Sequence, residues 1–383
     1  MKQKRILYFG IYQKDYPRNY LIIDALRENF FVDELNYDFF KQTKNIVGAS
    51  KKEKIKFLFK GFFLLFLYIL LTLKLILVQR RYDIIFTGYI GSLDNFVLSL
   101  LKRLKIIRKK VVANPLVSLY DTIVEDRGII KCRFFSNLII FFEEFSFKGV
   151  DLIIIDTYEN KRYFIEKFNL DENKVKVVWV GADERFFYKK EREDENKNKD
   201  KVKVLFFGKY IPLHGIENII KTIELLEEKK ESFKFIFIGR GQLFEYFQKE
   251  FKKLKEKDFD LEIIEWVDYE KLNNYINSSD IVLGIFGVTP KAKRVIPNKV
   301  FQAVAVGKVV FTAKTKAILE FFKEDEIVLI DEPFPENLKK HFLGYLENKD
   351  FYKKIGEKGY LKFKKLASKE ALSQMLKQIL LEL

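Results

Sequence analysis

The chain has 383 residues, of which 48% are hydrophobic and 32% are charged, a balance typical of an ordered protein long enough for two domains. Its single cysteine, Cys132, excludes an internal disulfide, and the N-terminal segment has too short an apolar run for a signal peptide. We therefore expect a cytosolic, reducing location.

The net charge of +16 is distributed unevenly along the chain. Residues 41–110 contain sixteen Lys and Arg against three acidic residues, so this fifth of the chain carries +13. Such a density favours an anionic partner, and we expect residues 51–110 to meet an anionic membrane surface. Nucleic acid is the alternative, but the aromatic residues here are not interleaved with the charges for base stacking, so we expect no nucleic-acid partner.

An apolar helix is predicted within this basic region, over residues 54–81. Its longest uncharged run, from Gly61 to Leu73, has thirteen residues, fewer than the about 20 that cross a bilayer, so a transmembrane helix is not expected. One edge of the helix is cationic: Lys56, Lys60 and Lys74. Two interpretations stay open. The helix is either part of the core with snorkelling lysines, or it lies in the surface of an anionic membrane, helped by the basic run at 102–110.

Short β-rich runs alternate with helical patterns throughout, which predicts two α/β domains, each a doubly wound parallel sheet flanked by helices. In the first half we expect strands at 5–10, 31–37, 82–88, 110–116, 150–156 and 174–181. In the second half we expect them at 202–208, 233–239, 260–267, 280–286, 308–313 and 326–330.

The predicted boundary between the domains is a charged segment without apolar residues at 191–200. This linker separates an N-terminal domain, 1–190, from a second domain, 201–350, and the helical pattern at 351–383 predicts a C-terminal segment that crosses back. Ligands of such sheets bind beyond the carboxyl ends of the strands, so we expect the site in the loops that follow them.

The clearest candidate site is the segment 294–311, which predicts a helix that receives phosphate. Pro297 keeps the preceding residue out of helical conformation, Asn298 is expected to cap, and an apolar stripe ends at Gly307. Lys299 in the first turn has the wrong charge for the helix dipole unless an anion is bound there too. We therefore expect the helix amides at 298–301 to meet a phosphate.

Other loops add candidate residues at the same edge. Lys209 ends one predicted strand and His214 precedes the next helix, while Gly239 and Gly241 form a turn that either approaches a ligand or is merely tight. The loop at 284–299 also contains several cations, and a solvated basic loop is the alternative for it: Lys291, Lys293, Arg294 and Lys299.

Several other kinds of site are not expected. No Gly-x-Gly-x-x-Gly follows the first strand, which disfavours a nicotinamide cofactor, and no Gly-x-Ser-x-Gly elbow of a hydrolase is present. Two histidines and one cysteine offer no credible zinc site, and His341 lies in a polar helix where we expect it to be solvated.

The order of the motifs resembles glycosyltransferase family 4, whose members are retaining enzymes with the GT-B fold. Four stretches of the second half carry the resemblance: FGKYIPLHGIENII, FIFIGRGQ, IEWVDYEKLNNYINSSDIVLGIFG and IPNKVFQAVAVGKVVFT. Four stretches of the first half are similar less specifically: KRILYFGIYQKDYPRNYLIIDAL, YDIIFTGYIGS, NPLVSLYDTIVEDR and DLIIIDTYENKRYFIEKF. The resemblance implies two facing Rossmann-like domains with a cleft between them, a nucleotide-diphosphate sugar as donor, and neither a cofactor nor a bound metal.

The resemblance also implies roles for single residues. Lys209 and His214 stand where the family places an arginine and a lysine on the donor diphosphate, and the family's two glutamates, eight positions apart, fall on Arg294 and Gln302. The amide of Gln302 can still hold ribose hydroxyls, whereas Arg294 implies a different sugar contact or a negatively charged sugar. The implied catalytic residues are Lys209, Lys299 and Arg294. The implied donor-binding residues are Gly208, His214, Gly239, Gly241, Trp266, Asn298, Val300, Phe301 and Gln302.

Acceptor-binding residues are expected in the first domain. No histidine precedes His214, so the histidine that many relatives place near the reacting sugar has no counterpart. Polar candidates for that region, and for a phosphate of a lipid-linked acceptor, are Arg18, Asn19, Asn114, Asp121 and Arg127. The alternatives are ordinary helix capping, surface pairing and a turn made by Pro17.

The expected function is therefore that of a hexosyltransferase-type glycosyltransferase (EC 2.4). It transfers a sugar, with retention, from a nucleotide-diphosphate sugar to a lipid-linked saccharide or cell-envelope glycan. The expected location is cytoplasmic, on the inner face of the cytoplasmic membrane. The alternative is a catalytically silent nucleotide-sugar-binding or scaffold protein of the same fold, because both glutamates are replaced.

Overall fold

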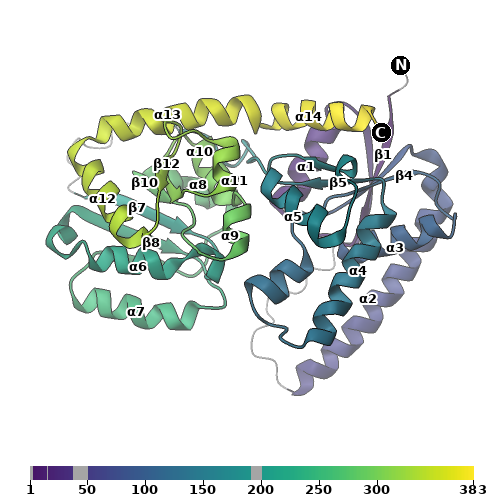
Figure 1. Cartoon of the computed structure of the whole chain (residues 1–383), viewed down its shortest axis with the longest axis horizontal. Helices are drawn as coiled ribbons and strands as arrows, with labels where there is room; N and C mark the ends of the chain where they lie inside the picture. Colours follow the sequence, from purple (N-terminus) through teal and green to yellow (C-terminus); the bar gives the residue numbers. More distant parts are fainter. Residues whose placement is uncertain (1–2, 15, 38–50, 191–200) are drawn as a thin grey trace. The chain divides into compact units, whose positions relative to one another are not determined.

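The computed structural model describes residues 3–14, 16–37, 51–190 and 201–383, and for residues 51–62 it describes the backbone alone (Figure 1). The chain forms two units. The first comprises Met1–Val124, Ile129–Val178 and Leu372–Leu383, and the second comprises Glu125–Gly128 and Trp179–Ala371. The division falls between Val178 and Trp179, before the predicted boundary at 190, and the predicted linker at 191–200 lies outside the described residues.

The first unit contains a parallel six-stranded sheet with the order β2-β1-β3-β4-β5-β6. Its strands are β1 (Arg5–Gly10), β2 (Phe31–Asn36), β3 (Ile84–Thr87), β4 (Lys110–Ala113), β5 (Leu152–Ile155) and β6 (Val175–Val177). Its helices are α1 (Pro17–Arg27), α2 (Lys51–Val78), α3 (Ser92–Arg103), α4 (Arg133–Gly149) and α5 (Tyr158–Phe168), with most of α14 (Lys369–Leu381).

The second unit contains another parallel six-stranded sheet, with the order β12-β11-β10-β7-β8-β9. Its strands are β7 (Val202–Phe207), β8 (Phe233–Ile238), β9 (Leu261–Ile264), β10 (Ile281–Leu283), β11 (Val309–Ala313) and β12 (Val328–Ile330). Its helices are α6 (Ile216–Glu224), α7 (Phe244–Glu256), α8 (Tyr269–Ser278), α9 (Pro290–Arg294), α10 (Asn298–Ala305), α11 (Lys316–Phe321), α12 (Phe334–Glu347) and α13 (Lys349–Leu366).

Every predicted strand is present within or close to its predicted bounds, and all the described strand pairs are parallel. The central strands are apolar runs because both faces of each sheet are covered; the last four residues of β8, for example, are all buried, whereas the edge strand β2 contains several polar residues. This confirms the doubly wound α/β fold class for each unit.

The C-terminal segment is helical, as predicted, and it returns to the first unit. Its end is held there by two hydrogen bonds: Asn29 Nδ2 donates to Ser373 Oγ over 2.7 Å, and Lys4 Nζ donates to the carbonyl oxygen of Leu380 over 2.8 Å. Earlier in the segment, α13 belongs to the second unit, where Gly356 approaches the backbone of Lys308.

The apolar segment of the basic region forms the long helix α2, which is attached to the first unit by a narrow stripe. Tyr68, Leu71 and Leu75 are buried in the core of that unit, but only 22% of the window Phe63–Arg81 is buried. This window has a mean hydropathy of 2.0, and by length and composition α2 is able to cross a membrane. The expectation that this helix does not span a membrane stays a prediction. Lys56 and Lys60 lie outside the described side chains.

Candidate functional site

The candidate site lies where the strand order of the second sheet reverses. β7 pairs with β8 on one side and with β10 on the other, so the chain leaves β7 and β10 in opposite directions along the sheet. The loops that follow β7, β8 and β10 all lie at the carboxyl ends of parallel strands. Such a switch point leaves a crevice above the sheet, which is where ligands of doubly wound domains bind.

Glycines let these loops pack backbone against backbone. A Cβ atom on Gly239 would lie 2.0 Å from the carbonyl oxygen of Gly208, and one on Gly241 would lie 2.5 Å from the amide nitrogen of Tyr210. Gly239 also has a φ of +140°, which side chains rarely adopt. The two glycines of the predicted turn therefore serve the close contact between the β7 and β8 loops.

Lys299, in the first turn of α10, is a buried cation without a hydrogen-bond partner. Its side chain is 5% exposed, and its Nζ atom lies 3.8 Å from the centre of the Phe206 ring. Burial lowers the pKa of this ammonium well below its ordinary value. A cation–π contact offsets part of the lost hydration, but an unpaired buried charge still costs several kcal/mol. An anion bound at Nζ would remove that cost.

His214 lies beside Lys299 as a neutral imidazole. It is 7% exposed, and burial together with the charge of Lys299 lowers its pKa well below 6.5. Its Nδ1 atom contacts the carbonyl oxygen of Lys209. Because a carbonyl oxygen only accepts, Nδ1 carries the proton and Nε2 carries the lone pair. A neutral His214 can accept a hydrogen bond from a ligand hydroxyl, but it brings no charge to a diphosphate.

Gly208 lets both side chains approach the backbone at the end of β7. A Cβ atom built on it would lie 2.9 Å from His214 Cε1 and 3.3 Å from Lys299 Nζ. Its φ is +141°, so glycine is required on conformational grounds as well. The sequence predicted that Gly208, His214 and Lys299 belong to one site, and the structure brings the three together.

Lys209 and Arg127 form a second group of cations in this unit. Lys209 has an exposed side chain, yet partial burial of its ammonium, and then the charge of Arg127, lower its pKa. Arg127 belongs to the segment Glu125–Gly128 of the second unit, and its Nε atom is buried without a hydrogen-bond partner. The structure therefore places Arg127 near Lys209, and its expected role toward an acceptor stays a prediction.

Two carboxylates that the sequence did not suggest accompany the basic loop. Glu125 forms an ion pair of 3.8 Å with Arg294, and Asp126 accepts a hydrogen bond of 3.3 Å from Thr289. Burial raises the pKa of Asp126, and the charge of Lys291 opposes that shift. Thr289 also caps α9 by accepting from the amide of Ala292. Arg294 is therefore partly neutralised within the unit.

The N-terminus of α10 differs from the prediction in its details. Its N-cap is Pro297, and Asn298 is the first helical residue without a capping hydrogen bond, which corrects the expected cap. The amide of Val300 donates to the carbonyl oxygen of Pro297 over 3.0 Å. Phe301 packs against Phe321 in the core. The side chains of Val300 and Phe301 are therefore structural, and the amide of Val300 already has a partner.

The remaining donor candidates are Gln302 and Trp266. Gln302 is 6% exposed, and its Nε2 atom donates to the hydroxyl of Tyr269 over 3.1 Å, so its carbonyl oxygen is the polar atom left for a ribose. Trp266 follows β9 and is 74% exposed. A role of either residue in donor binding stays a prediction.

The expected acceptor residues of the first unit are buried structural groups. Asn19 is completely buried, and its amide bonds to the hydroxyl of Tyr8 and to the backbone of Gln13 and Tyr89. Arg18 is 1% exposed, and burial lowers its pKa to about 10.

Arg18 is also bonded within the unit: Nε donates to Asn114 Oδ1, and a terminal nitrogen donates to the carbonyl oxygen of Val178. Asp121 is 3% exposed. The polar groups of Arg18 and Asn19 are thus bonded within the unit, and their role toward an acceptor stays a prediction.

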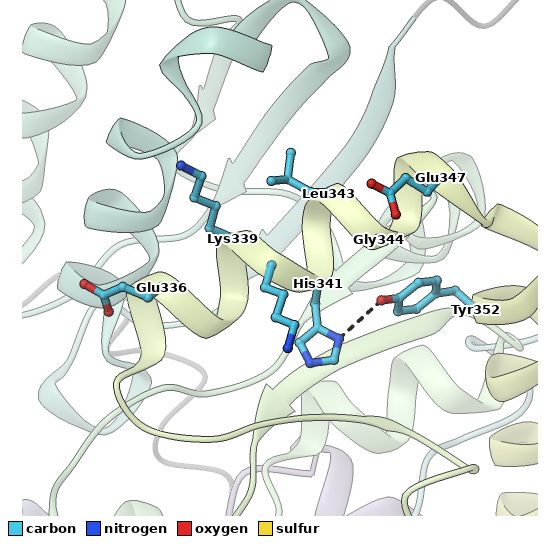
Figure 2. Close-up of a pocket in the computed structure, with 8 residues that line it drawn as sticks. Glu336, Lys339, His341, Leu343, Gly344, Glu347 and Tyr352 are labelled. Carbon is cyan, nitrogen blue, oxygen red and sulfur yellow. Dashed lines mark hydrogen bonds between the residues drawn. The ribbon is translucent and has the colours of Figure 1, made fainter.

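A pocket of about 470 Å³ lies away from these loops, along α12 (Figure 2). His341 and Tyr352 point toward each other in it, with 3.3 Å between Nδ1 and the hydroxyl oxygen. His341 is half-buried and its pKa is lowered by burial, so the expectation of a solvated histidine was wrong. The pocket is lined by two lysines and two glutamates as well, and none of the predicted site residues reaches it.

No group of three or more histidine, cysteine, aspartate or glutamate side chains suited to a metal ion occurs among residues 3–14, 16–37, 63–190 and 201–383.

Comparison with known proteins agrees with the geometry. The family model described as glycosyl transferases group 1 matches residues 187–362. A glycosyltransferase of Methanocaldococcus jannaschii, named as uncharacterized, is 23% identical over 55% of this chain. An uncharacterized 41.2 kDa protein in the cps region of Klebsiella pneumoniae is 24% identical over 57% of it. The matches span 53% and 57% of these two relatives, so the chain spans little more than half the length of either.

A solved structure with a similar fold is Anabaena HepE, determined in complex with UDP and glucose. It shares 14% sequence identity, with a TM-score of 0.69 and complete coverage of both chains. At this identity the likeness shows the fold alone, which is the two-domain α/β GT-B fold of glycosyltransferases. Residues 187–362 thus match the glycosyl transferases group 1 model, and the chain has the two-domain α/β GT-B fold.

Proposed function

We propose that the protein is a glycosyltransferase that transfers a sugar from a nucleotide-diphosphate sugar. The observation that carries this proposal is the buried, unpartnered ammonium of Lys299, which lies close to Gly208 and belongs to the first turn of α10. A diphosphate would supply the missing counter-charge, and the free amides at the start of α10 would add hydrogen bonds to it.

The chemistry requires stabilisation of the leaving group. When the glycosidic bond to the donor breaks, the electron pair stays on the diphosphate oxygen, which gains negative charge. Lys299 and Lys209 are cations of the same loop cluster, and preorganised positive charge in a partly dry site stabilises such a transition state by several kcal/mol. His214 is neutral and its Nε2 atom carries a lone pair, so it adds no charge and no donor to the diphosphate; it can accept a hydrogen bond from a hydroxyl group of the donor.

The donor's sugar and base are the finer part of the proposal. UDP is the first candidate nucleotide because HepE, which has a similar fold, was solved with UDP. Arg294 stands where the related family uses a glutamate, and this favours a sugar with a carboxylate, although Glu125 compensates part of its charge. Transfer with retention of configuration and a hexose as the transferred sugar belong to the same proposal.

For the acceptor we propose a lipid-linked saccharide or a cell-envelope glycan, reached at the inner face of the cytoplasmic membrane. The support for this part is the +13 charge of residues 41–110 together with the exposed apolar helix α2. Arg127 remains the acceptor-phosphate candidate, because its Nε atom has no hydrogen-bond partner.

A second candidate function is that of a silent nucleotide-sugar-binding protein. It is favoured by one observation: both positions of the family's glutamates carry other residues, and these residues, Arg294 and Gln302, already bond to Glu125 and Tyr269. Turnover of any nucleotide sugar, measured as release of free nucleotide with a membrane extract as acceptor source, excludes this candidate.

The experiment that tests the proposal is a thermal-shift screen of the full chain against UDP, GDP, ADP, CMP and dTDP forms of common sugars. A ligand at about 100 times its dissociation constant adds about 2.7 kcal/mol to the free energy of unfolding. We expect one nucleotide class to stabilise the protein clearly. A flat response to all of them contradicts the proposal.

A further inference from the structure

The first unit presents an apolar face on α2 that nothing in the described part of the chain covers. Seven large side chains of this helix are between 47% and 80% exposed: Phe63, Leu65, Phe66, Ile69, Leu70, Leu73 and Leu77. Single exposed apolar residues are common on soluble proteins, but a continuous row along one helix marks a binding surface.

The opposite side of α2 is fixed to the unit. Tyr68, Leu71 and Leu75 are buried, and the Tyr68 hydroxyl donates a hydrogen bond to Asp94 of α3. Asp94 also accepts a hydrogen bond of 3.2 Å from the amide of Ile11. Because successive residues of an α-helix are about 100° apart, Phe66, Leu70, Leu73 and Leu77 lie opposite this buried stripe. The helix is therefore held lengthwise against the unit while its outer face stays free.

The helix α4 has a similar outer face. Phe134, Leu138 and Phe141 follow the helical spacing i, i+4, i+7 and are 53% to 71% exposed. The other side of α4 is held to α3, where the rings of Phe96 and Phe142 stack with centroids 4.7 Å apart. Since α3 also holds α2 through Asp94, it is a common neighbour of both helices. In Figure 1 both α2 and α4 extend below the sheet of this unit.

Basic residues accompany these apolar faces. Lys74 lies beside the outer face of α2, Arg80 and Arg81 follow its end, and Arg133 begins α4; all four are exposed. Residues 54–82 contain no acidic residue. Apolar side chains with adjacent cations match the acyl chains and the headgroups of an anionic lipid surface. A second copy of the chain would instead bring like charges together.

We propose that α2 and α4 form a docking surface for the anionic face of a phospholipid bilayer, in which α2 lies along the interface rather than across the membrane. The buried stripe keeps one side of α2 on the protein, while the outer row enters the lipid and the basic side chains reach the headgroups. The inference concerns the first unit and is independent of the sugar-transfer chemistry, so it is tested without a nucleotide sugar.

Sedimentation of the full chain with vesicles tests the proposal. We expect binding to vesicles of equal parts phosphatidylcholine and phosphatidylglycerol, weak binding to phosphatidylcholine alone, and release at high salt. The variant Phe66→Ser/Leu70→Ser/Leu73→Ser should bind at least about tenfold more weakly. The matched control Tyr246→Ser/Leu319→Ser/Leu361→Ser removes three exposed apolar side chains of the second unit and should bind like the wild type.

The charges and the second helix have their own tests. Arg80→Gln and Arg81→Gln should each weaken binding to the anionic vesicles about fivefold. Cys132 is exposed and directly precedes α4, so an environment-sensitive fluorophore on this single cysteine reports on that helix in the otherwise unaltered chain. We expect a blue shift with anionic vesicles, and the same for a label on Leu77→Cys in a Cys132→Ser background.

Several results would overturn the proposal. The proposal that this face binds an anionic bilayer is contradicted if neutral and anionic vesicles bind equally well. It is also contradicted if the triple variant binds as the wild type does. A membrane-bound protein that resists alkaline extraction and needs detergent shows a spanning α2 instead. If the wild type is a dimer in solution, the α2 triple variant is a monomer, and both bind vesicles equally, the face belongs to an interface with a second copy of the chain.

Discussion

The Lys299 ammonium lies 3.8 Å from the centre of the Phe206 ring and has no hydrogen-bond partner. Phe206 is itself in the core, with 1% of its surface exposed, so a positive charge is held against an apolar wall at the end of β7. Folding alone does not favour this arrangement. An arrangement that lowers stability and gathers free donors is typical of a binding site.

The first prediction concerns the stability of the ligand-free protein. Lys299→Met keeps the shape of the side chain and removes the unpaired charge, so we expect the free energy of unfolding at neutral pH to rise by about 1 to 3 kcal/mol. The pKa of Lys299 is lowered on folding, so the unfolded chain binds the proton more readily and wild-type stability rises with pH toward 10.5. In urea denaturation, the difference in unfolding free energy between Lys299→Met and the wild type should therefore become smaller as the pH rises toward 10.5. A variant that is less stable than the wild type at neutral pH would contradict the account.

The second prediction concerns turnover. Lys209→Ala should cost about 2 to 4 kcal/mol of transition-state stabilisation, or a factor of roughly 10² to 10³ in kcat, because the leaving diphosphate loses a cation. The control is Lys293→Ala in the neighbouring basic loop, since Lys293 is 58% exposed and lies 3.9 Å from Glu332. Steady-state kinetics with the donor found by the thermal-shift screen provides the comparison. Equal turnover of the two variants would remove Lys209 from the mechanism.

The third prediction concerns the close contact between two loops. Gly239→Ala places a Cβ atom 2.0 Å from the carbonyl oxygen of Gly208, so the β7 loop must move. Gly307→Ala is the matched control: its φ is also positive, at +74°, but a Cβ there meets nothing closer than 3.6 Å. The unfolding free energy of the control should fall by only about 1 to 2 kcal/mol, because alanine adopts this backbone conformation unfavourably. Gly239→Ala should lose more unfolding free energy than the control and should also lose nucleotide binding. Equal losses of stability by the two variants in thermal denaturation would argue against the packing role of Gly239.

The fourth prediction concerns pH and the attachment of α2. Burial raises the pKa of Asp94 from 3.8 to about 7, so the folded protein holds this proton more tightly than the unfolded chain. Its contribution to stability is complete below about pH 4 and is lost as pH rises through about 7. Asp94→Asn keeps an acceptor for Tyr68 and Ile11 but does not titrate. We expect the variant to lack part of the fall in unfolding free energy that the wild type shows between about pH 4 and about pH 7; superimposable pH profiles would refute it.

Most of the fold was predictable because its signals are local. A run such as FKFIFI is apolar at nearly every position and forms β8, and the glycine after VAV ends α10 at Gly307 with a φ of +74°. Both features depend on a few neighbouring residues, which the sequence displays directly. The alternation of such runs with helical patterns then predicted parallel sheets and the loops that form the candidate site.

Contacts between distant parts of the chain could not be predicted from the sequence. Arg18 and Asn19 look like exposed polar residues in a loop, but Arg18 bonds to Val178 and Asn19 bonds to Tyr89, both far along the sequence. Likewise, α2 is apolar all round, so its sequence does not reveal which narrow stripe is buried. The pairing of Lys299 with Phe206 and of Arg294 with Glu125 also depends on tertiary packing that no local pattern encodes.

The most direct test of the account is calorimetric titration of the nucleoside diphosphate selected by the screen into wild-type protein, Lys299→Met and Lys293→Met. If the buried ammonium receives the diphosphate, Lys299→Met should bind about tenfold to a hundredfold more weakly because a charge-assisted hydrogen bond is lost. Lys293→Met should bind within about twofold of the wild type, because it removes only an exposed ion pair. Equal affinity of Lys299→Met and wild type would contradict the central claim.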